Sequence, residues 1–475
     1  MRKLRWAVIA AAATILGWQL FVQPVVGLAD QGDYARTIGR FGYGPADKSP
    51  PYYIVFVPRK FVRDPGFRVP NLEHVESEYL FAGAAVLLNK LISRDGTLDI
   101  EVIGLVHALA FLAAFARLLA VTNGLRAAPF VWIASLLILT DVGYVAYWNS
   151  FYSEPASCIF FLLLVSETVA IVRSGESSTA SIARWSLWAI LFVGAKFQNF
   201  PFALLLVPLA LRFGWQSRRT LARHVSIAGA GAILIVALFN LSLFPKPLRT
   251  ASTYNAVFLG ILPESKTPGA DLAWFHLEPQ LVRYSGTGAW SPGTAFPDLF
   301  QRGILGRELT PASVARFWIL HPTRIWRRAK AVLPIAFSLR PEWCGNFERV
   351  AGKPPGARSM SFTLWSMFHE QVMKRIGKFL IVLLFSSPIA AIAAWIARPR
   401  DRLRVECAAV LSACCLMGFL VAICGDAWDT VKHLFLFNLI LDTTLVSGAT
   451  FVLSVIYRCQ SHPGNAVSMD LIRKE

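Results

Sequence analysis

Four short clusters of polar side chains interrupt a sequence that is otherwise strongly apolar. They are Asp30-Gln31-Gly32-Asp33-Tyr34-Ala35-Arg36, Tyr147-Trp148-Asn149-Ser150-Phe151-Tyr152-Ser153-Glu154-Pro155, Lys196-Phe197-Gln198-Asn199 and Gly425-Asp426-Ala427-Trp428-Asp429-Thr430-Val431-Lys432-His433. A carboxylate that water can reach is able to accept a proton from an attacking hydroxyl. Lys and Arg side chains at the same level can hold a phosphate leaving group. With aromatic faces for sugar rings, this mixture indicates glycosyl transfer from a lipid-phosphate carrier.

The composition places these clusters in a membrane protein. Of 475 residues, 55% are hydrophobic and 16% charged, against about 45–50% and about 25% in average soluble chains. Apolar blocks of about 20 residues are long enough to cross the ~30 Å hydrocarbon layer, which excludes a soluble enzyme, a disordered protein and a secreted disulfide scaffold. The net charge of +18 is typical of cytoplasmic loops rich in Lys and Arg, so we expect no nucleic-acid partner. The seven cysteines form no CxxC pair and predict no metal site.

The apolar blocks predict an all-α polytopic membrane protein. They cover residues 6–28, 98–120, 128–148, 155–172, 185–213, 223–244, 377–397, 405–424 and 434–457. The first follows a basic start and contains a possible cleavage site at 27–29, but it is long for a signal peptide, which favours a retained span. The block at 185–213 fits one long span or a hairpin of two short ones. A hairpin turning at 196–201 returns the basic residues 212–223 and 398–404 to the cytoplasm. We therefore expect ten segments with both termini inside, in a bacterial inner membrane.

This topology divides the chain into three parts. Residues 1–244 form a first transmembrane module, whose outer loop 29–97 includes an amphipathic stretch at 78–91 expected on the membrane surface. Residues 245–376 form a second outer loop or small domain. Residues 377–475 form the last transmembrane module and a short cytoplasmic tail. All four polar clusters then lie at the extracytoplasmic ends of spans.

Each cluster also has a purely structural interpretation. Asp30 and Asp33 can cap the loop after the first span, and the aromatic residues of 147–152 can form an interfacial belt. Lys196 can extend to the interface, and Lys432 with His433 can pair with the acids three or four residues before them. Their common location on one side favours a shared cleft, because buried ionisable groups are costly and usually functional.

The sequence resembles the GT-C superfamily of membrane glycosyltransferases, and more narrowly the WsfD-type bacterial glycan hexosyltransferases. The resemblance is carried by residues 32–36, 149–155, 195–199, 255–262 and 425–433, of which the last is the most specific. It implies a GT-C-like helical fold and an inverting transfer of a hexose from a polyprenyl-phosphate donor to a lipid-linked or cell-envelope glycan acceptor.

The resemblance also implies roles for the polar residues. Asp33 is the first choice for the general base and Asp30 the second. The candidates for the donor phosphate are Arg36, Lys196, Lys432 and His433. The candidates for the sugar and the acceptor are Tyr152, Glu154, Gln198, Asn199, Asp426 and Asp429. No metal site is assigned, although Mg²⁺ or Mn²⁺ is a candidate cofactor that Asp33, Glu154, Asp426 and Asp429 can ligate. The expected partners are the lipid-linked donor, the glycan acceptor and membrane lipids.

Three other functions fit parts of the pattern. A transporter or flippase of lipid-linked sugars also has many spans and intramembrane charges, although the chain has no internal repeat. An O-antigen ligase or polymerase joins sugars on the same side of the membrane. A non-catalytic scaffold subunit predicts that substitutions at Asp33 are silent.

Overall fold

The computed structural model describes residues 1–51, 53–69, 71, 74–93, 95–175, 177–397 and 401–461. Within these residues the chain is a multi-pass helical membrane protein, with eight helical segments long and apolar enough to span a membrane and two shorter apolar helices. The bundle helices are α1 (Arg2–Phe21), α4 (Ile100–Thr122), α5 (Ala128–Leu139), α7 (Glu154–Ser174), α8 (Thr179–Val193), α9 (Ala203–Gln216), α10 (Thr220–Leu243), α17 (Lys374–Ala397), α18 (Arg402–Cys424) and α20 (Phe435–Ser461). The prediction of ten helical segments is confirmed.

The block at 185–213 folds as the predicted hairpin. Helix α8 ends at Val193, the 3-10 turn η4 (Phe197–Phe202) follows, and α9 continues from Ala203. Pro201 lies inside η4, where the missing amide donor is compatible with a tight turn but not with a continuous helix. The prediction of the hairpin rested on the basic residues of 212–223 and 398–404. In the first group, Arg212 pairs with Glu406 at 2.7 Å. Arg398 and Arg400 lie outside the described residues.

The first apolar block is only partly helical, which corrects the expected span of 6–28. Helix α1 ends at Phe21, three residues before Pro24, and the chain continues without regular structure. Residues 25–30 are buried, and the amides of Gly27 and Ala29 donate to the carbonyls of Asn346 and Gly345 at 3.0 and 2.9 Å. These residues are apolar because other parts of the protein cover them, and not because they face lipid.

The block at 128–148 is likewise shorter as a helix than expected. Helix α5 has 12 residues and so rises about 18 Å, less than the ~30 Å hydrocarbon layer. It ends before Asp141, whose carboxylate caps α6 (Val142–Val145) at the amide of Gly143 and accepts from the amide of Trp365 at 2.8 Å. The following residues are buried loop, stabilised by these contacts with the chain before α17.

The first long loop contains a small sheet that the sequence did not predict. Strands β1 (Tyr43–Pro45), β2 (Lys60–Arg63) and β3 (Leu98–Asp99) form an antiparallel sheet in the order β1-β2-β3. The short helices α2 (Tyr34–Thr37) and η1 (Ile38–Phe41) precede it. Helix α3 (Glu78–Ile92) buries Phe81 and Ala85 and exposes Leu87 and Leu91, which is the expected amphipathic pattern.

The second long loop consists of two parts with different packing partners. The first, called here the helical lobe, contains α11 (Lys246–Asn255), the π-helical segment η5 (Ala256–Ile261), α12 (Pro268–Trp274), α13 (Phe296–Gln301), α14 (Pro311–Leu320) and α15 (Pro322–Val332). It has its own hydrophobic core, which extends from Ala251 to Trp318. The second part, residues 333–362, packs on the first loop, where the amide of Gly345 donates to the carbonyl of Ile54 at 2.8 Å.

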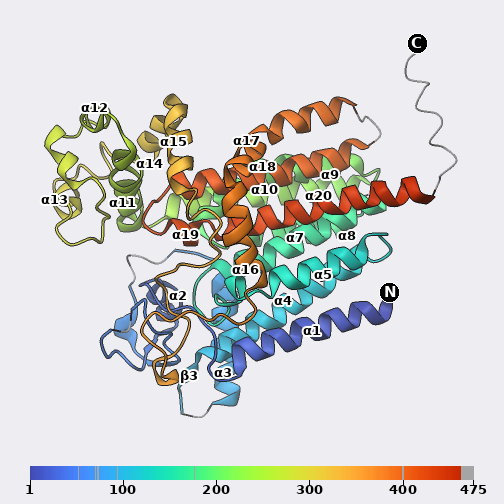
Figure 1. Ribbon diagram of the computed structural model, residues 1–475, viewed down its shortest axis with the longest axis horizontal. Helices are drawn as coiled ribbons and strands as arrows, with labels where there is room; N and C mark the ends of the chain where they lie inside the picture. The colour runs from blue at the N-terminus through green and yellow to red at the C-terminus, as the bar shows by residue number, and fades with distance from the viewer. Residues whose placement is uncertain are drawn as a thin grey trace.

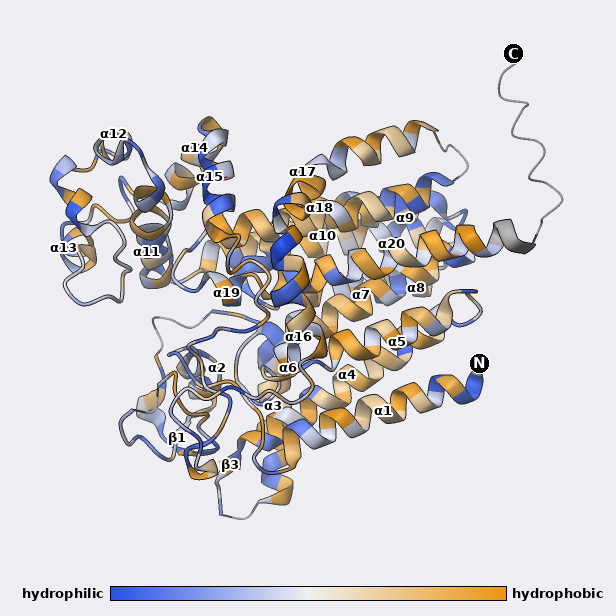
Figure 2. Ribbon diagram, viewed as in Figure 1, coloured by the Kyte–Doolittle hydropathy of each residue, from blue (hydrophilic) through white to orange (hydrophobic). Residues whose placement is uncertain are grey.

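The arrangement of the helices defines two ends of the bundle. Figure 1 shows the N-terminus and the far end of α20 on the same side, whereas α2, α16 (Leu364–Phe368) and the helical lobe lie toward the opposite side. The short helix α19 (Thr430–His433) also lies at this second side, called here the site end. In Figure 2 the bundle helices are mostly hydrophobic along their length, while the loops and the lobe are mixed.

Candidate active site

The loop after α1 is held in a tight turn by Asp30. Its Oδ1 accepts hydrogen bonds from the amides of Gly32 at 2.7 Å and Tyr34 at 3.1 Å. Gly32 has a φ of +103°, a conformation that glycine adopts without steric cost. The Asp30 side chain is buried, and burial raises its pKa to about 6 against the opposing effect of the two amides. Asp30 therefore shapes the loop that presents Asp33.

Asp33 lies between two cations and retains access to solvent. One carboxylate oxygen pairs with Arg36 and the other with Lys432, and the side chain is 25% exposed. Burial by itself would raise the pKa of Asp33, but the charges of Arg36 and Lys432 outweigh it and hold the pKa well below its usual value. The carboxylate is thus ionised and ready to interact with a ligand at neutral pH.

Lys432 connects the two ends of the sequence at this point. It belongs to α19, is buried, and lies 3.6 Å from Asp429 in addition to its pair with Asp33. Its ammonium group is 4.5 Å from the ring centroid of Tyr152, a favourable cation–π geometry. The Tyr152 hydroxyl donates to the carbonyl of Ala29 at 2.7 Å and accepts from the amide of Gln31 at 3.0 Å.

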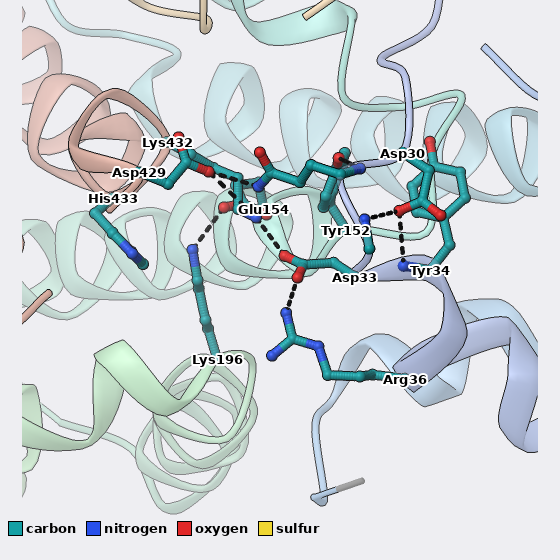
Figure 3. Close-up of polar contacts among 12 residues, drawn as sticks. Asp30, Asp33, Tyr34, Arg36, Tyr152, Glu154, Lys196, Asp429, Lys432 and His433 are labelled. Atoms are coloured by element: carbon teal, nitrogen blue, oxygen red, sulfur yellow. Dashed lines mark hydrogen bonds and ion pairs between the residues drawn. The ribbon is translucent and has the colours of Figure 1, made fainter. Parts of the chain in front are cut away.

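A second ion pair borders the first. Glu154, at the beginning of α7, pairs with Lys196 at 2.6 Å and is buried. Figure 3 shows Lys196, Glu154, Lys432 and Asp33 converging from different elements on one region. The other Glu154 oxygen, Oε2, is buried and has no protein partner among the described residues, and the same holds for Oδ1 of Asp429. Such oxygens are ordinarily satisfied by water or ligand.

A contact between the hairpin turn and α19 adds two further predicted residues, Gln198 and His433, to the border of this region. The Gln198 amide donates to the carbonyl of His433 at 2.7 Å, and Nδ1 of His433 lies 3.0 Å from Oε1 of Gln198. This reciprocal pair fixes the turn against α19. Both side chains are partly exposed and remain available to a ligand.

Three of the predicted residues are directed away from the Asp33 group. Asp30 caps its own turn, as described above. Asn199 is buried and donates to Ser157 at 3.1 Å and to the carbonyl of Phe192 at 2.9 Å, which closes the hairpin against α7. Asp426 accepts from Ser252 at 2.8 Å and Asn255 at 3.0 Å and so fastens the helical lobe to the chain after α18.

The donor set gives no support to a resident metal. Among the described residues, no group of three or more His, Cys, Asp or Glu side chains is arranged to hold an ion. Of the four carboxylates considered as ligands, Asp426 is bound in the lobe contact, while Asp33 and Glu154 are each paired with cations. A bound divalent ion would have to replace those pairs.

Several residues that organise the site were not singled out by the sequence. The Gln31 amide donates to Asp429 at 2.5 Å and so joins the first loop to α19. His107 of α4 lies between Glu78, at 2.9 Å, and the carbonyl of Trp148, at 2.8 Å. Asp442 of α20 accepts from Tyr144 at 2.7 Å. The signal available for the last two was an ionisable residue within or beside an apolar block.

The ion pairs around Asp33 are balanced in charge. Three carboxylates, Asp33, Glu154 and Asp429, face three cations, Arg36, Lys196 and Lys432. An anionic ligand entering here gains charge-assisted hydrogen bonds from cations that are already oriented. The carboxylates that it displaces from those cations become stronger proton acceptors. The arrangement therefore combines anion binding with base chemistry.

Comparisons with known proteins place the chain in a family. The YfdI N-terminal transmembrane domain model matches residues 3–466, and no curated protein gives a significant match. The chain is similar to the oligosaccharyltransferase AglB of Archaeoglobus fulgidus in complex with an inhibitory peptide and a dolichol-phosphate, with a TM-score of 0.41, 13% identity and coverage of 97% of this chain and 52% of that chain. It is also similar to the oligosaccharyltransferase of the same organism tethered with an acceptor peptide, with a TM-score of 0.39, 12% identity and coverage of 98% and 51%. The chain spans about half the length of these structures. By the family match, the chain belongs to the YfdI N-terminal transmembrane domain family.

Proposed function

We propose that this protein is a membrane glycosyltransferase, related to the WsfD-type hexosyltransferases. It moves a hexose from a polyprenyl-phosphate donor to a lipid-linked or cell-envelope glycan on the extracytoplasmic side of a bacterial inner membrane. The observation that carries the proposal is Asp33, a partly exposed carboxylate held between Arg36 and Lys432 at one end of an apolar bundle. A proton acceptor beside phosphate-binding cations is what this transfer requires.

The proposed reaction is a single displacement. The acceptor hydroxyl oxygen forms a bond with the anomeric carbon, and Asp33 accepts the hydroxyl proton. The bond between that carbon and the donor phosphate oxygen breaks, and the phosphate leaves with the bonding electrons. Arg36, Lys196 and Lys432 stabilise the charge that develops on the phosphate. The buried free oxygens of Glu154 and Asp429 accept hydrogen bonds from sugar hydroxyls.

Donor binding also prepares the base. Arg36 and Lys432 lower the pKa of Asp33, which makes it a weak base. When the donor phosphate takes hydrogen bonds from these cations, their hold on Asp33 weakens and its basicity rises toward the range suited to proton transfer. This coupling would make the base effective only when a donor is bound.

The test supplies the purified full chain with a panel of polyprenyl-phosphate sugars and a glycan acceptor, and measures the released carrier. The wild-type protein should release carrier from a hexose-loaded donor. Asp33→Asn should lose about 10²–10⁴-fold in rate, as expected for the loss of a general base, while the protein still folds and inserts into the membrane. The matched control is Asp47→Asn, at an exposed aspartate of the same loop with 56% side-chain exposure. Normal turnover in Asp33→Asn would exclude the proposed role.

A further inference from the structure

A cavity of about 540 Å³ opens in the helical lobe and shares no lining residue with the Asp33 group. It lies between the end of α12, the turn at 304–309 and the first half of α14. Its lining includes Trp274, His276, Arg307, Glu308, Thr310, Ser313 and Arg316. The volume falls within the range of small-molecule sites, ~300–1,000 Å³.

An aromatic side chain forms one wall and is held in a fixed orientation. Trp274 is half-buried and packs edge-on against Phe275 and Phe317, with ring centroids 4.8 and 5.3 Å apart. It also lies 6.0 Å from the ring of His321. A preoriented indole offers an apolar face to a pyranose ring with little loss of side-chain freedom on binding.

The polar wall carries two arginines and one carboxylate, so its net charge is positive. Arg307 pairs with Glu308 at 3.1 Å, whereas Arg316 has no ion pair among the described residues. Thr310 and Ser313 form the capping box of α14. His276 is exposed and adopts a left-handed φ of 57°, a conformation that is uncommon for residues other than glycine and marks a place worth functional attention.

Hydrogen bonds connect the helical lobe, which contains the cavity, to the part of the chain just before Lys432. On α14, Trp318 donates from its indole nitrogen to the carbonyl of Cys424 at 3.1 Å. On α15, Arg328 donates to the carbonyl of Ile423 at 3.0 Å. These bonds fix the lobe immediately before the 425–433 segment. Figure 1 shows α12 and α14 on the side of the molecule that also bears α19.

We propose that this cavity binds an anionic sugar residue of the acceptor glycan, at a distance from the hydroxyl that reacts. The sugar ring stacks on Trp274, and its carboxylate or phosphate group accepts hydrogen bonds from Arg316. The assignment of this sugar to the acceptor rests on the proposed function, whereas the binding of an anionic saccharide in the cavity does not. The cavity then selects acceptors by a feature remote from the bond that forms.

The test measures binding to the full chain in detergent by saturation-transfer NMR, which requires no turnover. The probes are hyaluronan tetrasaccharide for the carboxylate, glucose 6-phosphate for the phosphate and chitotetraose as a neutral oligosaccharide. At least one anionic probe should bind more tightly than chitotetraose, and Arg316→Ala should weaken that probe by about tenfold. Arg283→Ala is the matched control, because Arg283 is exposed in the same lobe but does not line the cavity.

Absence of binding by both anionic probes would overturn the inference, as would equal binding of anionic and neutral probes or equal loss in the two arginine variants. The loss of anionic probe caused by Arg316→Ala should be the same in an Asp33→Asn background. If Asp33→Asn transfers sugar normally while Arg316→Ala still loses the anionic probe, the proposed function fails and the cavity assignment stands. If transfer depends on Asp33 but no probe binds, the cavity assignment alone fails.

Discussion

The two lysines near Asp33 contact different carboxylates. Lys432 contacts Asp33 directly, whereas Lys196 contacts Glu154. Their types and their place beside apolar blocks made them predictable, because such charges are rarely retained without use. Their partners were not predictable, since the pairs join residues separated by 399 and 42 positions. For the same reason the sequence did not reveal that Asn199 and Asp426 turn toward other segments.

We expect Lys432→Ala and Lys196→Ala to weaken binding of the lipid donor more than binding of the acceptor. Each removes a cation from the proposed phosphate site, so the KM for the donor should rise about tenfold or more, while that for the acceptor changes little. Steady-state kinetics with each substrate varied in turn measures the difference. Lys48→Ala is the control, at a lysine whose side chain is 55% exposed. An unchanged donor KM in both site variants would remove the phosphate role.

The buried carboxyl of Asp426 should make the stability of the protein depend on pH. Burial raises its pKa from 3.8 to about 6, against the opposing bonds from Trp428, Ser252 and Asn255. Between pH 4 and pH 6 the carboxyl is ionised in the unfolded chain but still protonated in the folded one. The stability that the protonated carboxyl contributes below pH 4 is therefore lost above pH 6. The loss is on the order of 3 kcal/mol. Asp426→Asn should therefore gain thermal stability relative to the wild type as the pH rises from 4 to 7, and Asp298→Asn, at an exposed residue, should not. A constant difference between Asp426→Asn and the wild type would contradict this expectation.

At the scale of elements, hydropathy located the helices but not all of their ends. Residues 25–28 and 140–148 continue apolar blocks of the sequence, yet they are loop or short turns buried by other parts of the chain. A hydropathy pattern cannot distinguish lipid from a protein interior, because both exclude water. The hairpin was predictable since charge placement gave information that length alone did not.

The contact of α3 with α4 supports the segment that carries Tyr152 and Glu154. His107 has both ring nitrogens directed at acceptors, the Glu78 carboxylate and the Trp148 carbonyl, and both side chains are fully buried. Because a carbonyl oxygen only accepts hydrogen bonds, Nδ1 of His107 donates to the carbonyl of Trp148. This arrangement fixes the start of the loop that leads to the site.

Glu78→Ala should therefore destabilise the protein by about 2–4 kcal/mol, because it leaves His107 without its buried partner. Thermal unfolding of the full chain in detergent measures the loss. Glu78→Gln should recover much of it, since the amide still provides a hydrogen-bonding oxygen, and Leu87→Ala on the exposed face of α3 (64% exposed) should change little. Equal stability of Glu78→Ala and Leu87→Ala would show that the pair is not a support.

For the whole molecule, the two long loops were the least predictable parts. The strands of the first are only two to four residues long, too short for an alternating pattern to identify them. The second loop divides into a lobe with its own core and a segment packed on the first loop. That division depends on contacts between residues about 290 positions apart, such as Gly345 with Ile54, which periodicity does not encode.

The sides of the membrane from which the site can be reached distinguish sugar transfer at one surface from transport across the membrane. The site end carries the Asp33 group and the first loop, whereas Arg218 lies between α9 and α10 at the other end, and both Arg218 and Lys48 are exposed. In a chain with its native cysteines replaced by serine, Lys48→Cys should react with a membrane-impermeant maleimide in intact cells. Arg218→Cys should react only after permeabilisation, because clusters of basic residues remain in the cytoplasm. Reaction of residue 218 from outside, or of residue 48 only after permeabilisation, would reverse the orientation and turn the Asp33 group toward the cytoplasm.

A cysteine at residue 196, tested in the same way, should be protected from the cytoplasmic side whether or not donor is present. Labelling from both sides would instead indicate a path through the bundle, as a flippase requires, because alternating access must expose one site to each face in turn.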